Sequence, residues 1–200
     1  MAAEYYGPLS DMSRIKESLM SLLCDSKDVT KLIMPTLDNP HFTLEQNWYG
    51  GTFDKDINGQ TETATLMGHC FDAPYMEGAI TDNRCAVFIE TYLSKIENQH
   101  IKEVSVDIMV VCHKDLTKLS ETDKNYYNPT GVYGNRIDSA VQVINSLILN
   151  SDTIKENYSI GNMNLTKITP LYQYVPDTKF YGKCLSYTYQ SFYRRKNNVR

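Results

Sequence analysis

The stretch that decides the fold is Ile101-Lys102-Glu103-Val104-Ser105-Val106-Asp107-Ile108-Met109-Val110-Val111-Cys112. Its even-numbered positions from 104 to 112 are all apolar, and this period of two is typical of a strand with one buried face. Met109 and Val111 make the second half apolar on both faces. We therefore predict an interior strand that helices cover on one side.

A helical pattern follows a polar, turn-rich connection over residues 120–134. Its apolar positions form one stripe and are Ile137, Ala140, Val141, Ile144, Leu147 and Ile148. Asn135 is placed as the N-cap, with Asp138 in the first turn, where a carboxylate meets free backbone amides. This helix is expected to pack on the strand at 101–112.

The remaining pattern places further elements around this pair. A helix begins at Ser10 or Asp11, breaks at 25–28 and resumes until Pro35 stops it. Residues 64–70 and 86–96 are predicted strands, the second pairing antiparallel with 101–112 through a short turn at 98–100. An interrupted strand spans 165–175, broken at Pro170, and a closing hairpin leads to a last strand at 185–193.

These elements predict an α+β fold with a mixed, mostly antiparallel sheet packed against two main helices. Nothing divides the chain, so residues 1–200 are predicted to form a single domain. Three segments lie outside its regular part: an N-terminal arm at 1–9, a long irregular loop at 35–63 that contains Trp48, and a basic C-terminal tail at 194–200. Loops of this length are usually functional or ordered by a partner.

Composition narrows the class of protein. A hydrophobic content of 42% in 200 residues suffices for one core. No apolar run approaches the roughly 20 residues that cross a bilayer and the start lacks a signal peptide, so we expect a soluble protein made in the cytosol, without membrane contact. The net charge of −4 gives no general attraction to nucleic acid. Fifteen tyrosines favour assembly through wet interfaces.

The cysteines and histidines are the first candidates for chemistry. Five widely spaced cysteines, Cys24, Cys70, Cys85, Cys112 and Cys184, indicate reduced, buried thiols rather than a disulfide framework. His69-Cys70, Cys85 and Cys112-His113 have the side chains of a zinc site. Adjacent strand residues point to opposite faces, however, so buried cysteines beside exposed histidines are the preferred interpretation. No helix N-terminus activates a cysteine as a nucleophile.

Other candidate sites also lack an essential part. Glu90, Asp107 and Lys114 have the residue types of a metal-dependent nuclease, but the carboxylate-x-lysine pair at a strand end is missing. The segment 54–59 resembles a calcium loop without its closing glutamate. The glycines at 131–134 lack the strand and lysine of a phosphate loop. We therefore predict no catalytic, cofactor-binding or metal-binding residues and no enzymatic activity.

A resemblance to a known class of proteins rests on three motifs. They are Val104-Ser105-Val106-Asp107-Ile108-Met109-Val110-Val111-Cys112-His113-Lys114, then Tyr133-Gly134-Asn135-Arg136-Ile137-Asp138 opening a helix, then Phe180-Tyr181-Gly182-Lys183 before a tyrosine-rich strand. In this layout the chain resembles small neck proteins of tailed bacteriophages, and among them the tail-terminator (tail-completion) type. The resemblance covers residues 85–192 and the first helix.

The resemblance implies a structural virion protein, made in the host cytoplasm. Such subunits form a ring, typically a hexamer, that joins the tail tube protein to the head-side connector, with transient contact to DNA in the lumen. They have no catalytic residues to carry over. The chain is longer than the simplest terminators, so another head–tail connector or adaptor remains an alternative. A metal-dependent enzyme and a host-directed binding module that uses the Trp48 loop are alternatives of different classes.

Overall fold

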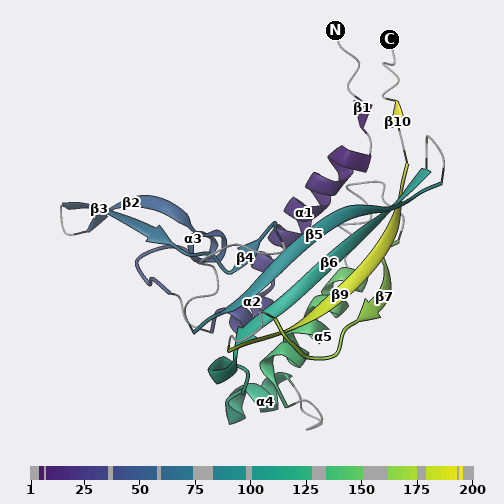
Figure 1. The fold of residues 1–200 in the computed structure, drawn as a ribbon. Coiled ribbons are helices and arrows are strands. Elements are labelled where there is room, and N and C mark those ends of the chain that lie inside the picture. The colour runs from purple at the N-terminus through teal and green to yellow at the C-terminus, as the bar shows by residue number, and fades with distance from the viewer. Residues whose placement is uncertain are drawn as a thin grey trace.

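The structure of the chain is a computed structural model. It describes residues 5–6, 8–35, 38–57, 60–73, 83–97, 101–127, 134–150, 162–174, 179–192 and 194–195. Helices lie on one face of a long, twisted sheet, and a two-stranded hairpin projects away from this body (Figure 1). The predicted α+β class is confirmed.

The helix layer consists mainly of α1 (Pro8–Asp25), α2 (Lys27–Ile33) and α5 (Arg136–Asn150). The predicted break between the first two is confirmed, and Ser26 caps α2 by accepting a hydrogen bond from the Val29 backbone amide at 3.3 Å. The predicted cap of α5 is also confirmed. Its Asn135 Oδ1 accepts from the Asp138 backbone amide at 2.7 Å, so the sequence pattern located this helix start within one residue.

The main sheet has the strand order β4-β5-β6-β9-β7, with β8 pairing on β9. Its strands are β4 (Cys70–Phe71), β5 (Cys85–Ile96), β6 (Ile101–His113), β7 (Asn164–Ile168), β8 (Tyr172–Gln173) and β9 (Phe180–Phe192). All pairs are antiparallel except β4 with β5. The strand at 101–112 lies in the interior, between β5 and β9, as predicted.

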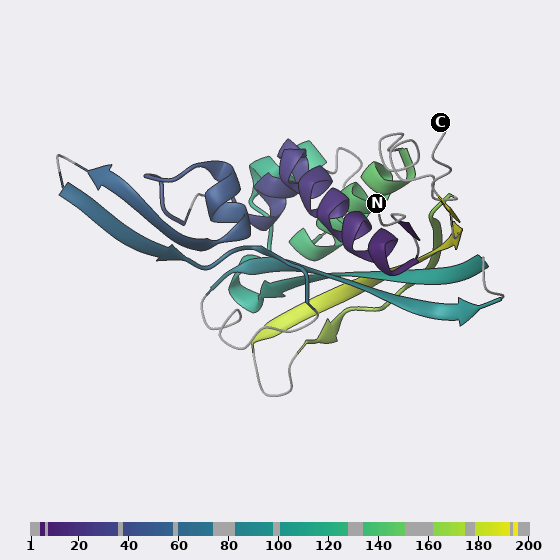
Figure 2. The ribbon, with the colours of Figure 1, turned by 90° about the horizontal axis from the view of Figure 1, so that it is seen from above.

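The core fills the space between the helices and one face of this sheet (Figure 2). Alternation along β6 directs its even-numbered residues toward the helices, where Val106, Ile108 and Val110 are wholly buried. Ile15 of α1 and Ile144 of α5 meet them from the other side. A polar tie joins the layers, because the buried Tyr187 hydroxyl donates to Asn145 Oδ1 at 2.8 Å.

The opposite face of the main sheet carries a smaller apolar cluster: Phe71, Ala86, Phe88, Val111 and Phe180, with Met109 and Tyr174 at its margin. Phe88 stacks between two neighbours, with ring centroids 5.1 Å from Phe71 and 5.6 Å from Tyr174. Among the described residues no helix covers this face (Figure 2). The second half of β6 is apolar on both faces because Met109 and Val111 pack in this second cluster.

The prediction of an irregular loop at 35–63 is wrong, because this segment has regular structure. It contains α3 (Leu44–Tyr49) and β2 (Gly51–Ile57), and β2 pairs antiparallel with β3 (Gln60–Leu66). Thr43 and Gln46 close a capping box at the start of α3, with each side chain bonded to the other's backbone amide. The strand predicted at 64–70 is consequently divided between β3, in the hairpin, and β4, in the main sheet.

Three smaller expectations also change. The connection at 120–134 contains a short helix, α4 (Glu121–Tyr127), which has no buried residue. A single 3-10 turn, η1 (Lys114–Leu116), precedes it at the end of β6. The N-terminal arm at 1–9 contributes β1 (Tyr5–Tyr6) and the first residues of α1. The basic tail contributes β10 (Arg194–Arg195), and β1 pairs antiparallel with β10. Residues 196–200 lie outside the described part of the chain.

Candidate functional site

The most distinctive candidate for function is the β2–β3 hairpin, residues 51–66, which we call the hairpin arm. Its two strands pair with each other and, among the described strands, with no third strand. Figures 1 and 2 both show it leaving the body alone. An isolated two-stranded hairpin is marginally stable in water. An arm of this kind is therefore suited to docking on another surface, which would supply the packing that the body does not.

The arm has two different faces, because directly opposed residues share a face. One face holds threonine and aspartate positions by register, in the cross-strand pairs Thr52–Thr65, Asp54–Thr63 and Asp56–Thr61. The Thr63 hydroxyl donates to Asp54 Oδ1 at 2.6 Å, and the Thr52 and Thr65 hydroxyls lie 3.1 Å apart. The other face carries the apolar positions Phe53, Ile57, Ala64 and Leu66.

Acidic positions outnumber basic ones in the sequence of the arm. Lys55 and Glu62 are direct cross-strand partners by register, and Asp54 and Asp56 occupy register positions of the opposite face. The sequence of the arm, residues 51–66, therefore has a net negative charge.

The root of the arm is built by close backbone contact. Gly50 adopts a φ of 70°, and a Cβ placed there would lie 2.3 Å from the Gly68 backbone nitrogen. A Cβ at Gly68 would lie 2.5 Å from the Tyr49 carbonyl oxygen. Only glycine fits at both positions, since the chain enters and leaves the arm with its backbones touching. The His69 backbone amide then donates to the Trp48 carbonyl at 2.8 Å and closes the root.

A charged cluster fixes the root to the main sheet. Both ring nitrogens of buried His69 contact acceptors: Nδ1 lies 2.6 Å from the Cys85 carbonyl oxygen and Nε2 lies 3.1 Å from Asp38 Oδ2. Arg84 donates to the same Asp38 oxygen at 3.2 Å and to the carbonyl of Met67 at 2.9 Å. This cluster joins three segments of chain, at residues 38, 67–69 and 84–85.

The cluster changes the titration of its carboxylate. Hydrogen bonding to His69, with the nearby positive charges of His69 and Arg84, holds the pKa of Asp38 below its usual value, although partial burial opposes the shift. A carboxylate with a lowered pKa stays ionised in mildly acidic solution. Asp38 thus remains a charged acceptor for Arg84 at neutral pH.

The position of Trp48 differs from the irregular, host-binding loop that the sequence predicts. It lies in α3 and is fully buried in the main core. Buried Asn47 beside it donates to the carbonyls of Asn39 at 3.0 Å and Thr43 at 2.9 Å. These two residues anchor the root and present no surface to a partner.

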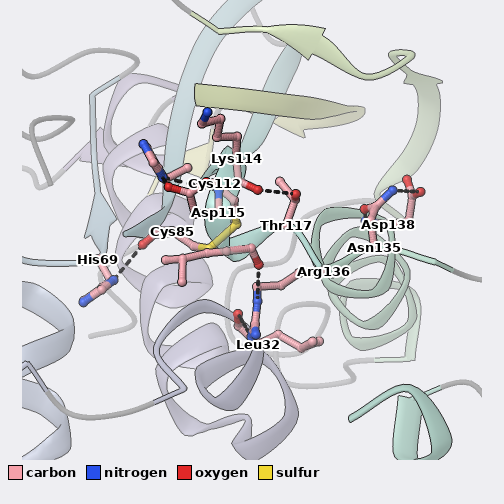
Figure 3. The surroundings of a disulfide bond; sticks show 12 residues. Leu32, His69, Cys85, Cys112, Lys114, Asp115, Thr117, Asn135, Arg136 and Asp138 are labelled. Atoms are coloured by element: carbon pink, nitrogen blue, oxygen red, sulfur yellow. Dashed lines mark hydrogen bonds and ion pairs between the residues drawn. A yellow bond between two sulfur atoms is a disulfide. The ribbon is translucent and has the colours of Figure 1, made fainter. Parts of the chain in front are cut away.

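The prediction that all five cysteines are reduced is wrong for one pair, Cys85 and Cys112 (Figure 3). Cys85 and Cys112 are direct cross-strand partners on β5 and β6 and form a disulfide in the structure. The other three cysteines are free and buried, as predicted. Burial raises the pKa of Cys24 and Cys184 to about 11, so these thiols stay protonated and are poor nucleophiles at neutral pH.

The side chains weighed as zinc ligands are not grouped as a metal site in the described part of the chain. The disulfide uses two of them, and the histidines are buried rather than exposed. His69 belongs to the root cluster, and the His113 ring packs edge-on against Phe180 with centroids 5.1 Å apart. Within the described ranges, no three histidine, cysteine, aspartate or glutamate side chains group as metal ligands.

The proposed nuclease residues are only partly assembled. Glu90 and Asp107 are direct cross-strand partners, and the Tyr92 hydroxyl donates to Asp107 Oδ2 at 3.3 Å. Lys114 follows the far end of β6, roughly 20 Å along the strand from Asp107 at about 3.3 Å per residue. A phosphate held by both groups is therefore not geometrically possible. The calcium-like segment at 54–59 consists of the last four residues of β2 and two residues outside the described ranges. Of the two glycines at 131–134, Gly131 lies outside these ranges, and Gly134 directly precedes the Asn135 cap of α5.

Comparison with known proteins gives one family. Residues 17–189 match the YomW family, and because the match spans most of the chain, the chain belongs to it. The family's name comes from a Bacillus phage region and indicates a phage protein. No curated protein matches the chain. No helix in the described ranges is long and apolar enough to cross a membrane.

Proposed function

We propose that this member of the YomW family is a structural, non-enzymatic virion protein that forms a ring in the neck of a tailed phage. In this role it is the tail terminator, or an adjacent neck component, joining the tail tube to the head-side connector. DNA passing through the lumen of the ring would touch it transiently. The family indicates a phage protein, and the proposal adds the place of the protein in the virion and its assembly into a ring.

The observation that carries the proposal is the hairpin arm. Its root is fixed by buried groups and touching backbones, whereas its strands extend beyond the body with a polar face exposed at Thr52, Asp54 and Thr63. Ring subunits must bind neighbours through surfaces that the single subunit leaves unpaired. A rigidly rooted arm of this kind supports a role in assembly.

Immunogold electron microscopy of purified virions tests the position. We expect an antibody against the chain to label the junction of head and tail, with an antibody against the tail-tube protein labelling the shaft as control. Fractionation then separates the alternatives: the chain on head-free tails indicates a terminator, and the chain only on heads indicates a head-side adaptor. Its absence from purified virions would contradict the proposal.

The hairpin arm also keeps a second candidate open, because the same exposed strands suit a host-directed binding module. The two functions differ in what removal of the arm destroys. Replacing residues 52–65 by a short glycine-serine linker should abolish ring assembly if the neck proposal is correct. If tails assemble normally with the shortened chain while a host interaction is lost, the binding module is the better account.

A further inference from the structure

Both outer edges of the hairpin arm lack a partner strand. β2 and β3 pair with each other along their whole seven-residue length and, among the described strands, with nothing else. Their pairing has no register shift, so each outer edge is regular from end to end. A regular edge presents a row of backbone N–H and C=O groups on which a further strand can form hydrogen bonds.

The side-chain contacts indicate which backbone groups lie on these outer edges. Opposed residues in an antiparallel pair alternate between two kinds: one exchanges backbone hydrogen bonds, and the other does not and holds its side chains closer. The Thr52 and Thr65 hydroxyls lie 3.1 Å apart, and the Thr63 hydroxyl donates to Asp54 Oδ1 at 2.6 Å. Both pairs therefore belong to the second kind, so the N–H and C=O groups of these four exposed residues point outward.

The edges of the main sheet are different, because they carry features that disfavour a further strand. At one edge the β7–β9 pairing shifts between Leu165 and Lys167, Lys167 is exposed, and Pro170 follows the strand. At the other edge the β5–β6 pairing shifts between Leu93 and Lys95. Bulges, lysines and prolines are the usual devices that keep a sheet edge unpaired. The strands of the arm contain neither a shift nor a proline.

We propose that β2 of one copy pairs antiparallel with β3 of a neighbouring copy, so that the arms of successive copies form one continuous sheet. This inference rests on the proposed function and names the contact that builds the ring. The outer edges lie on opposite sides of one narrow hairpin, which stands clear of the body, so they meet only between copies (Figures 1 and 2). Arms that stand side by side in the same orientation bring antiparallel edges of equal length together.

The continuous sheet keeps the acidic side chains apart. Outward residues of β3 then oppose outward residues of the neighbour's β2, so the threonines and Asp54 remain on one face. Each β2 lies between two β3 strands, which places the Asp54 positions of neighbouring copies about 10 Å apart, two strand spacings. The screening length at physiological ionic strength is about 8 Å, so their repulsion is weak.

The contact is head-to-tail, because each copy uses two different edges. Each added copy covers one edge and brings a new one, so free edges disappear only when the sheet closes on itself. Head-to-tail contacts generate a closed ring when the rotation between neighbours divides a full turn. The pairing would also supply the stability that an isolated two-stranded hairpin lacks.

Proline at an outward position tests the contact with full-length protein. Thr63→Pro removes an N–H from the β3 edge and Thr52→Pro removes one from the β2 edge, while hydrogen bonds inside the arm are kept. Assembly is measured by light scattering, with tail-tube protein present if the wild type needs it. Each variant should need at least about tenfold more protein to assemble than the wild type. The controls Thr63→Val and Thr52→Val lose the hydroxyl but keep the N–H, and both should assemble normally.

A mixture of the two proline variants tests the head-to-tail arrangement. It offers one intact contact, between β2 of the Thr63→Pro copy and β3 of the Thr52→Pro copy, and every other β2–β3 contact meets a proline. The mixture should therefore stop at a complex of two copies. Dimers formed by either proline variant alone would show that like edges pair and would overturn the proposed contact.

Hydrogen exchange gives a readout that does not depend on the substitutions. Backbone amides in residues 51–57 and 60–66 should exchange at least about tenfold more slowly when the wild type assembles, because the edge amides gain acceptors. Unchanged exchange in the assembled wild type would overturn the contact and leave the neck proposal standing. Thermal unfolding of each variant confirms that the body remains folded.

The remaining outcomes separate this inference from the function beneath it. Proline variants that assemble as well as the wild type would overturn the contact and leave the neck proposal standing. Valine controls that fail together with the proline variants would overturn it too, because hydroxyls rather than backbone edges would then carry the contact. A wild type that stays monomeric with and without tail tube would overturn both proposals.

Discussion

The guanidinium of Arg136, in the first turn of α5, donates a hydrogen bond to the carbonyl oxygen of Leu32 in the last turn of α2, at 3.0 Å (Figure 3). Its Nε donates to the Leu116 carbonyl at 2.8 Å, and the residue is only 6% exposed. One buried cation thus supplies donors to a helix end and to the segment after β6. Burial lowers the pKa of this guanidinium, which remains charged.

Arg136→Met should therefore destabilise the subunit. The substitution keeps much of the side-chain volume but leaves two carbonyls without their donor, and an unpaired buried group costs about 1–3 kcal/mol. We expect the free energy of unfolding in urea to fall by about 3 kcal/mol. The control Lys118→Met changes an exposed side chain. A loss below about 0.5 kcal/mol, the usual size of a surface effect, would contradict the assigned role.

The Cys85–Cys112 disulfide should make stability sensitive to reductant. It closes a loop with a sequence separation of 27, for which the chain-entropy relation gives roughly 3.5 kcal/mol. Reduction should lower the free energy of unfolding by about 2–4 kcal/mol. The double variant Cys85→Ala/Cys112→Ala should unfold identically with and without reductant. Unchanged wild-type stability, with an unreduced mass equal to the reduced mass, would contradict the bond.

The Asp38 cluster should contribute to acid sensitivity. Because the pKa of Asp38 is lower in the folded chain than its usual value of 3.8, the unfolded chain binds the proton first as pH falls. The stabilisation is fully present above the unfolded value and is lost below about pH 4. The free energy of unfolding in urea should be measured between pH 2 and 6. Below pH 4 this free energy should fall less steeply with decreasing pH for Asp38→Asn than for wild type. Equal slopes would count against the cluster.

Strands and helices that border the core were predictable from the sequence. β5, β6 and β9 and the helices α1, α2 and α5 each bury one face, so apolar residues recur with the period of the element. The hairpin arm lies off the core, so its strands lack that apolar period. The signals that could have found it are its threonines and the dipeptide Asn58-Gly59 between two strand-length runs.

Two other features required information that patterns alone do not carry. The short helix α4 buries no side chain, and its one signal is Ser120, whose hydroxyl accepts from the Asp123 backbone amide at 3.1 Å. The disulfide depends on register. A shift between Leu93 and Lys95 moves the β5–β6 pairing by one residue, and this shift brings Cys85 opposite Cys112 instead of His113.

The measurement that tests the central claim most directly is the native mass of the purified protein. Light scattering across a range of concentrations, alone and with the tail-tube protein, reports assembly without assuming a stoichiometry. The account predicts a discrete oligomer, or a ring that appears when tail tube is added. A strict monomer at every concentration that ignores the tail tube would contradict the neck assignment.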